Sequence, residues 1–148
     1  MPSRVFHASL KTLAFAACAV LAFALGGCAQ EPPTPVPFKP VPAGRILIPL
    51  YTQPAPGLVA VDVRRERGSD VIVRFRDAPV YLDGQHVTDL MNGEHVVFYL
   101  SPGVHRIGVT TQFDPVVELR FLVDARYTNR ASVWFDKEHR IQIRRVAQ

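Results

Sequence analysis

The sequence predicts an all-β domain, and three observations lead to that prediction. Apolar and polar residues alternate with a period of two through most of the chain after residue 44, helical periodicity is hard to find there, and turn-forming pairs such as Asp83-Gly84 separate the alternating segments. Because this period puts every second side chain on one face of a strand, the segments indicate about seven to nine short strands. We expect two packed antiparallel sheets, a β-sandwich, with a small closed β-barrel as the alternative.

The first part of the domain has three alternating segments, each with its apolar members on one face: Ile46, Ile48 and Leu50; Val59, Val61 and Val63; and Val71, Val73 and Phe75. Pro49 lacks the N–H that a central strand must donate, so the first segment is expected at a sheet edge. In the third segment Arg74 and Arg76 have the opposite parity and are expected to point outward.

Turn signals divide the middle of the domain. They and the strands next to them are Asp83-Gly84 between 80–82 and 86–90, Asn92-Gly93 before 94–100, and Ser101-Pro102-Gly103 between 94–100 and 104–111. Glycine accepts the positive φ of a tight turn, so each signal predicts a hairpin. After a wider turn at 113–115, we expect one more alternating strand and a terminal hairpin: Val117, Leu119, Phe121 and Val123, then 127–135 with 140–146.

Residues 1–27 have the organisation of a secretory signal, with Arg4 and Lys11 before an apolar run and small residues before Cys28. The run Leu25-Gly26-Gly27-Cys28 resembles the processing site of bacterial lipoproteins, which implies that Cys28 is acylated and becomes the mature N-terminus. An uncleaved membrane helix is the less favoured alternative, because such a helix needs about 20 apolar residues. Ala29, rather than Asp, follows the cysteine, which by the same resemblance implies sorting to the outer membrane, on its periplasmic side.

Residues 28–43 are expected to form a linker that starts at the lipidated Cys28. Prolines stand at nearly every second place from Glu31 to Pro42. Proline fixes its own φ and pushes the preceding residue toward extended geometry, so this stretch is expected to be a polyproline-like spacer. The domain itself is then expected to cover 44–148, a common domain size.

Charge and cysteine content argue against nucleic-acid binding and against a disulfide in the folded domain. The chain has 17 Lys and Arg against 13 Asp and Glu, and loss of Arg4 and Lys11 with the signal leaves 15 against 13. So weakly basic a domain is not expected to bind nucleic acid. Cys18 lies in the signal and Cys28 is expected to carry acyl chains, so no disulfide is expected in the folded domain.

A series of short motifs resembles PEGA-type domains and, more closely, a group of small bacterial outer-membrane lipoproteins of unknown function. The motifs are Val80-Tyr81-Leu82-Asp83-Gly84, Leu90, Gly93-Glu94, Phe98-Tyr99-Leu100, Pro102-Gly103-Val104-His105 and Ile107. Ser101-Pro102-Gly103 stands where PEGA domains have Pro-Glu-Gly. The resemblance implies a small sandwich of the immunoglobulin or transthyretin kind, often an accessory module of the envelope, with no known chemistry to carry over.

No pattern for catalysis, a cofactor or a metal is evident in the sequence. His86, His95, His105 and His139 remain after processing, none at metal-ligand spacing, and no serine lies in a Gly-x-Ser-x-Gly turn. His105 is expected to hydrogen-bond the turn at 101–103. We therefore do not expect an enzyme.

Arginines are the one distinctive surface feature. Arg64, Arg74, Arg76, Arg140 and Arg144 share outward parity and are candidates for an anion-binding stripe; the alternative is a solvated face that discourages edge-to-edge pairing. The leading hypothesis is a non-enzymatic, lipid-anchored module that contacts an envelope protein or an anionic polymer such as lipopolysaccharide or an acidic glycan. A structural subunit of an envelope or secretion assembly and a hydrolase inhibitor are the alternatives.

Overall fold

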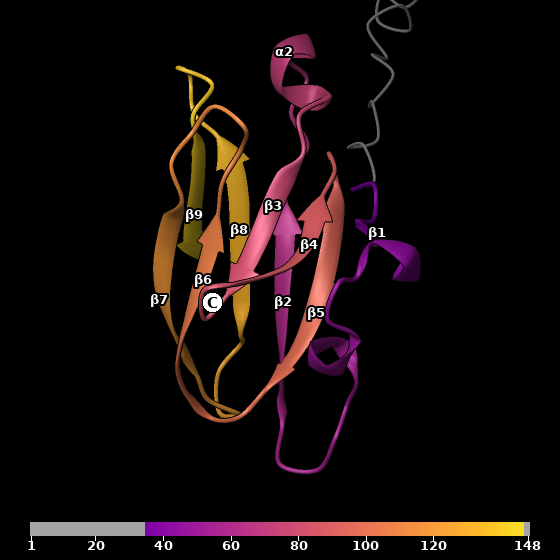
Figure 1. Ribbon diagram of the computed structural model, residues 1–148, viewed down its shortest axis with the longest axis vertical. Helices are drawn as coiled ribbons and strands as arrows, with labels where there is room; N and C mark the ends of the chain where they lie inside the picture. The colour runs from indigo at the N-terminus through magenta and orange to yellow at the C-terminus, as the bar shows by residue number, and fades with distance from the viewer. Residues whose placement is uncertain (1–34, 147–148) are drawn as a thin grey trace, which may run out of the picture. The chain divides into compact units, whose positions relative to one another are not determined.

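A computed structural model describes residues 35–146, which form a sandwich of two β-sheets (Figure 1). The predicted signal, Cys28 and the predicted linker up to residue 34 lie outside the described residues. Sheet A has the strand order β1-β5-β2-β8-β9 and sheet B the order β4-β3-β6-β7. The two sheets do not join into a closed barrel over the described residues, so the expected sandwich is confirmed and the barrel alternative is wrong.

The strands of sheet A are β1 (Lys39–Pro40), β2 (Val59–Arg65), β5 (Glu94–Leu100), β8 (Arg130–Phe135) and β9 (Ile141–Arg145). Those of sheet B are β3 (Ala78–Leu82), β4 (Gln85–Leu90), β6 (Gly103–Val109) and β7 (Val117–Val123). Pairing within sheet B is antiparallel, whereas sheet A contains two parallel pairs, β1 with β5 and β2 with β8. The expected antiparallel pairing therefore holds for most strand pairs, and the parallel pair in the middle of sheet A joins β2 and β8, which come from distant parts of the chain.

The hydrophobic core lies between the sheets. Alternation in β2, β7 and the terminal hairpin β8–β9 places apolar residues inward as predicted, and the buried cluster consists of Val61, Val63, Ala78, Val80, Leu82, Val87, Leu90, Val96, Phe98, Leu100, Ile107, Val109, Phe121, Val123, Ala131, Val133 and Ile141. Burial of this apolar surface is the main favourable term in folding.

The expected edge strand at 46–50 is wrong. The chain forms two 3-10 helices there, η1 (Ala43–Arg45) and η2 (Pro49–Thr52). Pro49 occupies the first turn of η2, where its missing N–H costs nothing. Ile46 and Ile48 pack against the core, but Leu50 is 72% exposed, so the three residues do not share a face.

The expected strand at 71–75 is also wrong. Residues Val71–Arg74 form a one-turn helix, α2, that connects sheet A to sheet B. Asp70 caps it by accepting a hydrogen bond from the Ile72 N–H at 2.7 Å, and an Asp at this position favours a helix start over a strand. Val73 is buried, whereas Phe75 is 70% exposed, so the strand parity assigned to Arg74 and Arg76 does not hold.

Of the three hairpins predicted from the turn signals in the middle of the domain, two join strands of different sheets instead. Asp83 and Gly84, with φ of 49° and 86°, join the paired strands β3 and β4 as predicted. The turns at Gly93 and Gly103 also have positive φ, but they join β4 to β5 and β5 to β6, which lie in different sheets. A glycine turn reverses the chain; whether the flanking strands pair or pack face to face depends on their partners.

The end of the linker belongs to the domain. Lys39 and Val41 donate hydrogen bonds to the carbonyls of Gly93 and His95, which makes β1 an edge strand beside β5. Pro40 lies between the two donors and Pro42 follows Val41, so only alternate N–H groups are available to pair, and that spacing suits an edge strand. The folded unit therefore begins at about Pro37 rather than at residue 44.

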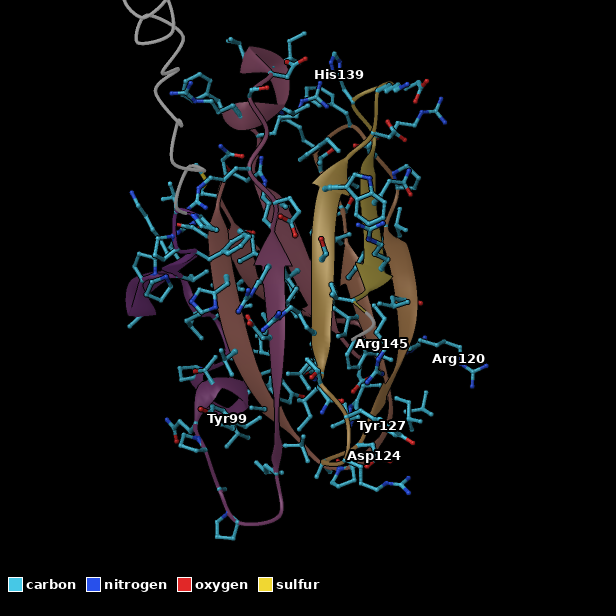
Figure 2. The ribbon with its side chains drawn as sticks, turned by 180° about the vertical axis from the view of Figure 1, so that it is seen from behind. Tyr99, Arg120, Asp124, Tyr127, His139 and Arg145 are labelled. Atoms are coloured by element: carbon cyan, nitrogen blue, oxygen red, sulfur yellow. The ribbon has the colours of Figure 1, made fainter. Side chains whose placement is uncertain are left out.

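Four connections gather at one end of the sandwich, which we call the α2 end: the β2–β3 connection with α2, and the β4–β5, β6–β7 and β8–β9 loops (Figure 1). Figure 2 shows His139 at this end and Asp124 and Tyr127 at the opposite one. No helix among the described residues is long and apolar enough to cross a membrane.

Candidate functional site

The α2 end is built around a buried arginine. Arg65, the last residue of β2, continues the inward parity of its strand and is 1% exposed. Its guanidinium donates to the carbonyls of Val73 and Leu90, both at 2.7 Å, and to that of Arg76. Arg65 therefore ties the C-terminal part of α2 and the residues that follow it to the end of β4.

Burial lowers the pKa of Arg65 to about 10, while Asp77 and Glu94 act in the opposite direction. The guanidinium stays charged at neutral pH. Its carbon also lies 5.1 Å from the centre of the Phe135 ring, a favourable cation–π distance. The acceptors are backbone carbonyls rather than a carboxylate, so the role of Arg65 is to position α2 and not to bind a ligand.

A cleft of about 300 Å³ lies between the start of α2 and the β8–β9 turn. Its walls are polar and aromatic, and the lining residues are Glu66, Arg67, Gly68, Ser69, Asp70, Val73, Asn92, Trp134, Phe135, Asp136, Lys137 and His139. We call it the cleft. Most of it is formed by residues 66–73 and 134–139, which are far apart in sequence and meet because β2 and β8 are neighbours in sheet A; Asn92 of the β4–β5 loop completes it.

Hydrogen bonds fix the polar walls of the cleft. His139 Nε2 lies 2.9 Å from Asp70 Oδ2, which joins the β8–β9 turn to the N-cap of α2. Ser132 donates to Glu66 at 2.7 Å. The Ile72 N–H and then His139 lower the pKa of Asp70, so this carboxylate is ionised at neutral pH. The cleft thus offers carboxylates, a histidine and an indole on a fixed frame.

An apolar surface lies on the other side of α2. Val71, Ile72, Phe75 and Phe113 are 68%, 56%, 70% and 68% exposed, and we call these four residues the apolar tip. Ile72, Phe75 and Phe113 line a common groove of about 480 Å³. Two arginines stack on its rings, Arg74 on Phe75 and Arg76 on Phe113.

The five predicted arginines fall into two groups. Arg64 and Arg144 share the outer face of sheet A, since both pair with Ser132 in the register of β8. Arg64 Nε forms an ion pair with Asp62 Oδ2 at 2.6 Å, and the Arg144 guanidinium stacks on the Trp134 ring.

The other three arginines belong to the α2 end. Arg74 and Arg76 flank the apolar tip, Arg76 also donates to the His139 carbonyl at 3.0 Å, and Arg140 lines a groove next to Phe113. The parity argument that joined Arg74 and Arg76 to Arg64 fails because residues 71–74 are helical. Whether the arginines bind anions stays a prediction.

Each histidine of the domain pairs with a carboxylate: His86 with Asp89, His95 with Asp62, His105 with Asp83 and His139 with Asp70. His105 also lies 2.9 Å from the Ser101 carbonyl, which confirms its predicted bond to that turn. Over residues 35–146, no three potential metal ligands gather in one place.

Sequence reasoning missed Arg65, Trp134, Phe113 and the pair Asp70–His139. Signals existed for two of them. The inward parity of Val61 and Val63 extends to Arg65, and Gly68-Ser69-Asp70 before an apolar pair is a helix-start signal. Nothing local predicts that the β8–β9 turn meets α2, because that contact depends on the parallel pairing of β2 with β8.

No family model, curated protein or solved structure matches this chain.

Proposed function

We propose that this protein is a lipid-anchored, non-enzymatic binding module on the periplasmic side of the outer membrane, and that its cleft binds a segment of an envelope protein. The observation that carries the proposal is the cleft itself, where Trp134, Lys137 and the Asp70–His139 pair line one recess. An indole beside fixed polar groups is typical of protein-binding surfaces.

The size and chemistry of the cleft favour a protein over an anionic polymer. At about 300 Å³ it is at the lower limit of small-molecule sites, which are mostly apolar, and it has room for one or two side chains. Glu66, Asp70 and Asp136 line it beside Arg67 and Lys137, so its carboxylates would repel a polyanion.

The sequence supplies the argument for the anchor. Cys28 follows an apolar segment that ends in Gly26-Gly27, and eight residues separate it from Pro37, where the folded unit begins. Because a single acyl chain gives only marginal membrane binding, stable anchoring requires more than one chain at the cysteine.

The anchor is tested by the substitution Cys28→Ser in the full chain. We expect the variant to leave the membrane fraction or to accumulate as an unprocessed precursor, as judged by fractionation and intact mass. A variant that stays in the membrane fraction at its normal processed size would contradict the anchor.

The cleft is tested with a photoreactive residue at Lys137 in living cells. Arg126, exposed at the opposite end, is the matched control position. We expect a discrete protein adduct from position 137 that disappears when Trp134→Ala is added, and no such adduct from position 126. Absence of an adduct at 137, equal adducts at both positions, or an adduct that persists with Trp134→Ala would argue against the cleft as the binding site.

A further inference from the structure

We infer that the apolar tip rests on the lipid bilayer, so that the domain lies against the membrane instead of moving freely at the end of its linker. This inference depends on the proposed lipid anchor. It assigns a ligand class, the interfacial region of a phospholipid bilayer, to the surface formed by Val71, Ile72, Phe75 and Phe113.

The first argument is the exposure of the tip. Four large apolar side chains that are each more than half exposed come from two different loops, and three of them, Ile72, Phe75 and Phe113, line one groove. Contiguous apolar surface of this kind marks a membrane or protein contact, whereas single exposed apolar residues are ordinary. A rival pair, Val104 and Leu122, faces solvent on sheet B toward the opposite end.

The position of the tether decides between the two surfaces. Residues 37–39 lie at the α2 end. The Pro37 carbonyl accepts a hydrogen bond from the Arg67 guanidinium at 2.5 Å, and the Lys39 backbone N–H donates to the Gly93 carbonyl in the β4–β5 loop. At the polyproline rise of about 3.1 Å per residue, the nine steps from Cys28 to Pro37 span about 28 Å. A chain acylated at Cys28 would therefore hold the α2 end toward the bilayer and the Val104–Leu122 pair away from it.

Charges of both signs surround the tip. The basic groups beside it or on neighbouring segments are Arg74, Arg76, Lys137 and Arg140, and the acidic ones are Asp70, Asp77, Asp114, Asp136 and Glu138. We therefore expect the tip to bind through its apolar side chains, with little dependence on lipid charge. Arg74 and Arg76 stack on the rings and have stems long enough to keep their guanidinium groups at the headgroup level.

The tip is already formed before it meets a membrane. Arg65 holds the carbonyls of Val73 and Arg76, and Asp70 caps the helix, so insertion would require little ordering of the chain. Preorganised surfaces lose less entropy on binding.

The test uses the lipidated chain reconstituted in phospholipid vesicles, with tryptophan as a depth probe. Trp134 is the only tryptophan of the sequence, so the Trp134→Phe variant has no tryptophan fluorescence of its own. Phe75→Trp and, separately, Ile72→Trp place the probe in the tip, and Leu122→Trp is the matched control on the rival apolar pair. Lipids brominated near the carbonyl level quench probes that lie about 5 to 10 Å below the surface.

We expect both tip probes to lose emission and shift to the blue, and the Leu122 probe to do neither, in zwitterionic and in anionic vesicles alike. Unquenched tip probes, or equal quenching at position 122, overturn the inference. Quenching that appears only after envelope proteins are added also overturns it and assigns the tip to a protein. The fraction of chain bound to vesicles is measured separately, so loss of the anchor is distinguished from an anchored chain whose tip stays in water.

Discussion

At the scale of single residues, Arg65 is the least ordinary feature of this domain. A guanidinium that is nearly inaccessible usually faces a carboxylate, but this one faces three backbone carbonyls and an aromatic ring. Carbonyls at the end of a helical turn carry partial negative charge, which compensates part of the desolvation cost. The positive charge is therefore used to hold a loop rather than to bind a ligand.

Replacement of Arg65 by Met should reduce the free energy of unfolding by about 3 kcal/mol, because three buried acceptors lose their donor. Arg64→Met, one residue away and partly exposed, should cost less than about 1 kcal/mol. Urea denaturation of the two variants measures the difference. Equal losses would mean that the buried hydrogen bonds of Arg65 contribute nothing specific.

Asp83 makes stability depend on pH. Desolvation raises the pKa of Asp83, but the Arg106 N–H and His105 outweigh it and hold the pKa below its usual 3.8. A carboxylate with a depressed folded-state pKa stabilises the fold above its unfolded-state pKa and loses that contribution as pH falls toward the folded-state value. Asp83→Asn, which tolerates the positive φ at this position, should flatten the fall in melting temperature below about pH 4. An unchanged slope would exclude Asp83 as a contributor.

At the scale of elements, α2 shows where sequence periodicity fails. Val71, Val73 and Phe75 alternate like a strand, yet the segment passes from sheet A to sheet B, and Asp70 satisfies its first free N–H groups as a helix cap. The strands β2, β7, β8 and β9 were predictable because each has one face on the core over five or more residues. Short connecting segments have no such constraint, so local capping decides them.

The candidate site was harder to predict for the same reason. The cleft and the apolar tip are both built from connections, and their members meet only because β2 pairs with β8 across a large sequence separation. Strand pairing between such distant segments produces no periodic pattern in the sequence. Only the inward parity of Arg65 and the helix-start signal at Asp70 were visible locally.

Val73→Asp tests α2 as a separate element. Val73 is buried but does not belong to the main core cluster, so a charge there should release α2 while the sandwich still melts cooperatively. Val63→Asp, inside that cluster, should abolish the transition. Hydrogen exchange at residues 70–76 and a thermal melt separate the two results. Loss of cooperative melting in Val73→Asp would make α2 part of the core.

At the scale of the whole molecule, the boundary between linker and domain has a measurable consequence. Residues 37–43 cover part of the edge of β5, and Phe38 lies under the guanidinium groups of Arg64 and Arg67. The fragment 44–148 lacks these contacts. It should still fold as a β-protein, since it loses Val41 at the margin of the core but keeps every residue of the buried cluster.

The fragment 37–148 should melt at a higher temperature than 44–148 and should scatter less light at high concentration, because an uncovered strand edge pairs with other chains. Circular dichroism and light scattering of the two fragments provide the comparison. Identical melting and scattering would show that β1 contributes nothing, and would restore residue 44 as the boundary.

The parallel pairing of β2 with β8 also determines the order in which the molecule can fold. Sheet B uses only residues 78–123, so it is complete soon after that stretch is available, whereas β2 gains its second neighbour only when residues 130–135 arrive. Contacts between such distant segments give a high contact order, and two-state β-proteins of this kind fold in milliseconds to seconds. As the chain is made from its N-terminus, one edge of β2 therefore stays open until residues 130–135 are available, which is the interval in which a chaperone would bind it.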